Sequence, residues 1–168
     1  MNRVCSWCHK SLGSIDSDVH SEGVVTHGIC QDCLDDIFSK SSLDFTLFLN
    51  SISAPVAIVD KNGVFQSAND LAQSLLNKDR SEIIHKMSGE AFSCKNASLP
   101  GGCGKTIHCA ECELRNTIIE TYEHNKDQVD IPVTLIQEKE SQREMFHFLV
   151  STQKINDLVL MKIDELYL

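Results

Sequence analysis

Hydrophobic residues follow two different patterns along the chain, and the change between them falls near residue 40. Residues 1–36 contain only scattered apolar side chains, so this segment is too poor in core to fold by hydrophobic burial alone. From residue 43 onward, apolar positions recur at the spacings typical of helices and strands. The pattern therefore predicts a small N-terminal module over residues 1–38, followed by one domain over residues 39–168.

The second domain opens with an apolar stripe at helical spacing, which predicts a helix over residues 41–53 that ends before Pro55. The stripe consists of Phe45, Phe48, Leu49 and Ile52. Such a stripe must be buried, either against the domain's own sheet or against a second copy of the chain. We expect a homodimer formed through this helix.

A hairpin and a capped helix follow the stripe. The apolar run 56–60, the turn 61–63 and the run 64–67 predict two antiparallel strands. Asn69 is placed to cap a helix that continues to Leu76, because its short side chain can accept from the first free N–H groups.

The rest of the chain completes a mixed α+β pattern. Residues 77–112 are rich in loop-forming residues, and Leu114, Ile118 and Tyr122 then predict a helix that ends near residue 124. Three strand-like runs close the sequence, at residues 130–136, 145–152 and 157–163.

This order of elements resembles a PAS domain over residues 43–168. The residues that support the resemblance are the opening hairpin 53–63, the helix-capping Asn69, the Gly89-x-x-Phe92 pair and Asp164, which resembles the start of the family's exit linker. The resemblance implies a five-stranded antiparallel sheet with helices on one face, a sensing pocket and dimerisation through an N-terminal helix.

Composition and charge exclude several classes of function. The chain carries 24 acidic against 15 basic side chains, a net charge of -9, which disfavours binding to nucleic acid or to an anionic membrane surface. No apolar run resembles a signal peptide or a membrane span, so we expect a cytoplasmic protein. Because thiols stay reduced in the cytoplasm, its eight cysteines predict metal binding or redox chemistry.

The first four cysteines form two Cys-x2-Cys pairs separated by 21 residues. They are Cys5, Cys8, Cys30 and Cys33. Each pair supplies one edge of a tetrahedron, and together they predict a closed, structural zinc site. His9 and His27 are more simply explained as solvated groups or neighbours of the ligands. The segment resembles a small four-cysteine, zinc-ribbon-like module found on bacterial sensors and response regulators.

The second four cysteines have irregular spacing and lie in the loop 93–112. They are Cys94, Cys103, Cys109 and Cys112. Glycines flank Cys103, so the backbone can approach a bound centre and direct N–H groups at sulfur. Lys105, His108 and Arg115 could offset the thiolate charge. The run PGGCGKTxxCxxCxxR resembles an insertion in a subset of bacterial PAS sensors.

The irregular spacing leaves the identity of the second centre open. An iron–sulfur cluster takes one thiolate at each corner and tolerates irregular spacing, which slightly favours it over zinc. Bare redox thiols are a third interpretation. The run Gly104-Lys105-Thr106 suggests a phosphate-binding loop, but the first glycine of that motif would fall on Leu99 and no apolar strand precedes it.

These observations predict a cytoplasmic, bacterial PAS sensor that carries zinc in its N-terminal module. Its second centre responds to redox state or a gas, and a separate kinase or regulator supplies the output. We find no convincing catalytic constellation and expect no enzyme. One rival hypothesis keeps the fold and makes both centres structural zinc, so that the chain is an adaptor or ligand-binding module. The other makes it a thiol oxidoreductase that uses Cys109 and Cys112.

Overall fold

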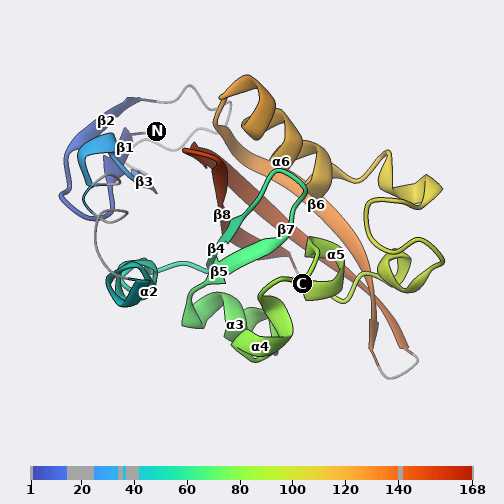
Figure 1. Ribbon diagram of the computed structural model, residues 1–168. Helices are drawn as coiled ribbons and strands as arrows, with labels where there is room; N and C mark the ends of the chain where they lie inside the picture. The colour runs from blue at the N-terminus through green and yellow to red at the C-terminus, as the bar shows by residue number, and fades with distance from the viewer. Residues whose placement is uncertain (1, 15–24, 34–35, 37–41, 140–141, 168) are drawn as a thin grey trace. The chain divides into compact units, whose positions relative to one another are not determined.

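The computed structural model describes residues 2–14, 25–33, 36, 42–139 and 142–167 (Figure 1). The chain divides into two compact units, Met1–Ile52 and Ser53–Leu168. The expected boundary after residue 38 lies outside the described residues, and the helix expected over residues 41–53 falls within the first of these units. Within the described part of the chain, no helix is both long and apolar enough to cross a bilayer.

The N-terminal unit contains a small sheet that the sequence did not predict. Strand β1 (Asn2–Cys5) pairs antiparallel with β2 (Ser11–Ser14) and parallel with β3 (Val25–Gly28). These strands are four residues long, too short for a clear periodic pattern.

The predicted helix of the apolar stripe is α2 (Ser42–Asn50). Phe48, Leu49 and Ile52 are buried within the chain, whereas the side chain of Phe45 lies outside the described residues. The Phe48 ring lies 5.2 Å from that of Trp7, which explains why the helix groups with the N-terminal unit. Most of the stripe is therefore already covered within one chain, and the homodimer stays a prediction.

The second unit is built on a five-stranded antiparallel sheet in the order β5-β4-β8-β7-β6. Its strands are β4 (Val56–Val59), β5 (Phe65–Ala68), β6 (Gln128–Lys139), β7 (Gln142–Ile155) and β8 (Leu158–Tyr167). The expected hairpin and the three closing strands are confirmed. Strand β8 pairs with β4, the first strand of the unit, so the pairing at the centre of the sheet joins the two ends of the unit's sequence.

Strand β8 corrects one expectation, because Asp164 does not start an exit linker. The strand continues through it to Tyr167 and stays paired with β7. The Asp164 carboxylate accepts a hydrogen bond from the Ser151 hydroxyl and forms an ion pair with Lys162. These contacts, all within the sheet, hold the acidic residue in the strand.

Short helices connect β5 to β6 (Figure 1). They are α3 (Asp70–Leu76), α4 (Arg80–Ile83), α5 (Ser88–Ala91), the 3-10 helices η1 (Lys95–Ser98) and η2 (Ile107–Cys109), and α6 (Glu113–His124). As predicted, Asn69 caps α3: its Oδ1 accepts from the N–H of Ala72 at 2.9 Å. The same oxygen accepts from Val56 at 3.0 Å, so one buried amide fixes the helix to the hairpin.

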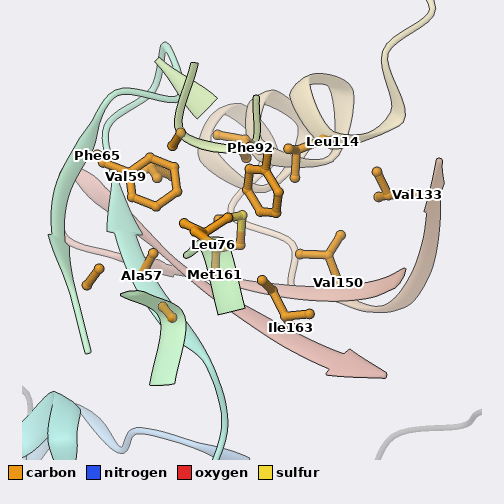
Figure 2. Close-up of a cluster of buried hydrophobic side chains, with 14 of the residues drawn as sticks. Ala57, Val59, Phe65, Leu76, Phe92, Leu114, Val133, Val150, Met161 and Ile163 are labelled. Carbon is orange, nitrogen blue, oxygen red and sulfur yellow. The ribbon is translucent and has the colours of Figure 1, made fainter. Parts of the chain in front are cut away.

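The core of the second unit lies between these helices and the sheet (Figure 2). Phe92, directly after α5, stacks on Phe148 of β7 with centroids 5.2 Å apart and planes 3° from parallel. Leu114 of α6 is buried in the same cluster, and the side chains of Cys94 and Cys112 pack against it. The second cysteine set therefore lies against the core.

Candidate metal centres

The first cysteine set forms a compact group in the N-terminal unit. The Sγ atoms of Cys5, Cys8, Cys30 and Cys33 all lie within 4.8 Å of one another. Those of Cys8 and Cys30, one from each pair, are 3.6 Å apart. A tetrahedral zinc with Zn–S bonds of about 2.3 Å separates its thiolates by about 3.8 Å, so a small contraction would close these four around one ion.

Backbone and side-chain contacts around the two pairs support this arrangement. Strand β1 ends at Cys5, and the turn that follows places the N–H of His9 on the Cys5 carbonyl at 2.9 Å. His9 adopts a left-handed backbone (φ 58°) in this turn and its side chain is exposed. The ion pair between Lys10 and Asp32, at 3.2 Å, links the two pairs across the surface. The two pairs are therefore held together by contacts other than the thiols.

The local electrostatics favour a thiolate at one corner of the first set. Burial alone raises the pKa of the Cys5 thiol, but the backbone N–H groups of Cys8, Cys30 and Trp7 outweigh it and bring that pKa down to about 6. The N–H of Cys30 lies 3.4 Å from the Cys5 sulfur. Burial, followed by the neighbouring thiols, raises the pKa of Cys33. Neighbouring thiols of one group thus have their pKa values moved in opposite directions, down at Cys5 and up at Cys33.

The second cysteine set faces a single cavity in the second unit. The cavity has a volume of about 570 Å³, and all four of these cysteines line it. Leu114 and Ile118 from α6 and Leu135 from β6 supply apolar parts of its wall. Four cysteines that span 18 positions of the sequence, from Cys94 to Cys112, are thus brought to one site.

Cys109 is the most strongly supported sulfur of the second set. Its Sγ atom accepts the N–H of Gly104 at 3.2 Å, and the Thr106 hydroxyl lies at the same distance. Burial raises the pKa of Cys109, but these donors, with the nearby Arg115, lower it below its usual value. Gly104 has a φ of 82°, which glycine adopts without strain. The expectation that this glycine-rich loop aims N–H groups at sulfur is met at Cys109.

Cys103 approaches the backbone of α5 closely. A Cβ atom on Gly89 would lie 2.7 Å from the Cys103 sulfur, so this position has no room for a side chain. Burial raises the pKa of Cys103, the N–H of Gly89 opposes that shift, and the thiols of Cys109, Cys112 and Cys94 add to it. The sulfur is therefore close enough to the other three to sense their charge.

The last two cysteines connect the centre to secondary structure. Cys112 is the N-cap residue of α6, and the N–H groups of Leu114 and Arg115 partly offset the effect of burial, which raises the pKa of Cys112. Cys94 precedes η1 and forms an isolated bridge with Gln137 of β6. The buried Gln137 amide donates to the Phe92 carbonyl at 2.9 Å.

The two sets differ in how tightly their sulfurs gather. Among the described residues, which include all eight cysteines, the first set is the group of sulfurs gathered closely enough to hold one metal ion, and the second set forms no such group. A single zinc ion needs the tighter arrangement. A cluster holds its thiolates farther apart, because each binds a different iron at a different corner. The all-thiolate donor set and the apolar parts of the cavity wall fit a cluster.

The basic residues expected around the second set divide into two groups. Arg115 and His108 line the cavity, and the positive charge of Arg115 helps to lower the pKa of Cys109. Lys105 does not line it and instead packs against Gly101. Sequence reasoning missed Thr106 and Gly89 as neighbours of sulfur. The sequence did contain one indication for Thr106: it lies three residues before Cys109, at the start of a short turn, where its hydroxyl can reach the group three positions on.

Comparison with known proteins agrees with this fold. The family model described as the PAS fold matches residues 43–102. The Rhodobacter sphaeroides LOV protein superposes with a TM-score of 0.53 at 12% identity, over 78% of this chain and 67% of that one. The PAS domain of nitrogen regulation protein NR(II) from Vibrio parahaemolyticus gives 0.48 at 16% identity, over 75% and 99%. No curated protein matches the chain.

The family match begins near the start of α2 and extends into the cysteine loop. The superposition on the LOV protein exceeds a TM-score of 0.5, and the second unit contains a single five-stranded antiparallel sheet. The second unit of the chain therefore has a PAS-like fold, with the second cysteine set in the segment that leads into α6.

Proposed function

We propose that this chain is a bacterial PAS-type sensor whose second cysteine set holds an iron–sulfur centre that responds to redox state or to a gas. One observation carries the proposal. Four cysteines line one cavity beside the core of the second unit, and, unlike the first set, they do not gather into a group that could hold a single ion. Zinc occupies the first set and stabilises the N-terminal unit.

The residues around the second set support two of its ligands in different ways. Gly104 and Thr106 donate to Cys109, and Gly89 leaves the space that Cys103 fills. The apolar side chains of Leu114 and Ile118 limit water at the centre. When bound, the cluster supplies reversible electron transfer and reactivity toward oxygen.

A structural path leads from the centre to the sheet. Cys112 caps α6, and at the far end of that helix the buried hydroxyls of Thr121 and Thr152 lie 2.6 Å apart. Lys154 of β7 donates to the Tyr122 carbonyl at 2.7 Å and lies over its ring. A change at Cys112 would thus reach β7 through α6. In this proposal the role is sensing rather than catalysis, and a separate kinase or regulator reads it.

Absorption spectroscopy of protein purified without oxygen tests the proposal. A brown colour with broad visible absorption that fades in air is expected of an iron–sulfur protein, with the N-terminal zinc retained. A colourless protein that contains two zinc ions would instead support the structural adaptor. A colourless, metal-poor second set with a reactive Cys109 would support the thiol oxidoreductase.

A further inference from the structure

The members of the first cysteine set are not equally accessible to solvent. Cys8 is exposed, whereas the other three members of the set are buried. Among the eight cysteines, all of which the structure describes, Cys8 is also the most open, since the remaining four are buried or half-buried. Oxidation of cysteine follows exposure and thiolate character, so a small oxidant in solution would meet Cys8 before any other ligand of this set.

One buried cysteine lies directly beside Cys8. The Sγ atom of Cys30 is 3.6 Å from that of Cys8, and the two residues belong to different Cys-x2-Cys pairs. The sulfurs of a disulfide are about 2.05 Å apart, so an approach of about 1.5 Å would join these two. Cys5 is held differently, because it is fully buried and its sulfur accepts the N–H of Cys30 at 3.4 Å.

Contacts on both sides of this close pair hold its two turns together. Two residues before each of the two cysteines, the N–H of Ser6 donates to the carbonyl of Gly28 at 2.8 Å. Two residues after each of them, the ammonium group of Lys10 pairs with the carboxylate of Asp32 at 3.2 Å. Neither contact involves a sulfur atom, so both remain available to hold the pair together while its thiols react.

From the exposure of Cys8 and its distance to Cys30 we infer that the first set is also a modification site, at which a hydroperoxide oxidises Cys8 and Cys30 then forms a disulfide with it. This role is additional to the structural role proposed for zinc, and it does not depend on what the second set holds. Zinc, when bound, keeps a coordinating thiol as the thiolate, which is the form that attacks a peroxide.

The reaction consumes one peroxide and both cysteines. The Cys8 thiolate attacks one oxygen of hydrogen peroxide, the O–O bond breaks, and the departing hydroxide takes a proton from solvent, which leaves a sulfenic acid on Cys8. The Cys30 thiolate then attacks the Cys8 sulfur, the S–O bond breaks, and the second hydroxide is protonated to water. The two sulfurs lose two electrons in total, and the peroxide is reduced to two molecules of water.

The disulfide acts on zinc binding and on a neighbouring aromatic contact. It removes two of the four thiolates, so the set can no longer hold zinc. Trp7 directly precedes Cys8, and its ring lies 5.2 Å from the ring of Phe48 in α2. Because Phe48 is fully buried, a shift of Trp7 changes the packing of the helix that precedes β4 in the chain. Oxidation of the exposed cysteine thus has a route to α2.

Peptide mass spectrometry of the full-length protein tests the pairing. Trypsin places the first Cys-x2-Cys pair in the peptide 4–10 and the second in the peptide 11–40, so a link between the pairs joins the two peptides. We expect brief treatment with hydrogen peroxide to join them through Cys8 and Cys30 and to release about one zinc per chain, relative to a sample kept in air. A link within either peptide, a link through other cysteines, or full retention of zinc would overturn the inference.

Two matched variants test the order of events. In Cys30→Ser the sulfenic acid on Cys8 has no partner, so dimedone should trap it, whereas in Cys8→Ser dimedone should label no cysteine of the first set. Each variant lacks one ligand, so loss of zinc affects both alike. If either fails to fold, dimedone added to the wild type with the peroxide should label Cys8 several-fold more than Cys30. Equal labelling of the two would contradict the inference.

The outcome can be separated from that for the second set. Cys109→Ser, which we expect to lose the iron of the second set, should form the same link after peroxide treatment. If it forms none, the link depends on the second centre and the inference is overturned. A wild-type protein without iron would contradict the proposed sensor function and leave the test of Cys8 and Cys30 unchanged.

Discussion

Replacing Gly89 by alanine tests the geometry at the second centre, because the sign of the change in the free energy of unfolding depends on what lies against α5. In a helix, alanine is normally more stable than glycine by about 1 kcal/mol, so the substitution would stabilise α5 if nothing lay against it. In this structure the new methyl group would lie 2.7 Å from the sulfur of Cys103 and 3.2 Å from its Cβ atom. It would also lie 3.3 Å from the Cβ atom of Ala97.

The crowding should outweigh the helix preference. Overpacking by one methyl group in a closely packed site costs about 1–3 kcal/mol, so we expect a net loss of roughly 0–2 kcal/mol in the free energy of unfolding. The new methyl group would displace the Cys103 side chain. Because Cys103 is a proposed ligand, retention of metal at the second set should fall as well.

A double-mutant cycle isolates this contact. Urea unfolding is followed by circular dichroism for wild type, Gly89→Ala, Cys103→Ala and the double variant, all reduced and free of metal. The cost of Gly89→Ala should shrink when the sulfur is absent. If Gly89→Ala stabilises the wild-type background by about 1 kcal/mol, Cys103 does not lie against α5 and the reasoning is refuted.

Three further predictions follow from the two units. Thr106→Val should weaken metal retention at the second set by about 10- to 100-fold, whereas Thr106→Ser keeps the hydroxyl and should behave like the wild type in chelator competition. Trp7 is the sole tryptophan and packs on Phe48, so removing zinc should shift its fluorescence to the red; an unchanged spectrum would mean that metal does not hold this unit. If the chain dimerises through α2, the exposed Leu47 should take part, and light scattering should show a dimer that Leu47→Glu dissociates without loss of helicity.

Local patterns predicted the elements that are long or have a distinctive residue at their ends. The cap at Asn69, the helix 113–124 and the closing strands all combine periodicity with a recognisable boundary. The β6 and β7 strands are longer than expected because their polar ends remain paired with each other out to Lys139 and Gln142. Pairing between strands supplies that stability, and it is not visible in a local window of sequence.

The parts that could not be predicted depend on contacts between distant segments. Pairing of Val56 with Lys162 joins residues more than a hundred positions apart, and the sheet in the N-terminal unit depends on a parallel pairing of short strands. The cysteine spacing indicated two sets, but only the fold shows that the second gathers at one cavity. The role of Gly89 likewise follows from its distance to Cys103, which the sequence does not contain.

Metal and sulfide analysis of the wild-type protein, purified without oxygen, tests the central claim most directly. A cluster at the second set and zinc at the first predict iron and acid-labile sulfide in nearly equal amounts, together with about one zinc per chain. Cys109→Ser should lose the iron and sulfide and keep the zinc, since the first set is unchanged. Two zinc ions per wild-type chain with neither iron nor sulfide would contradict the account.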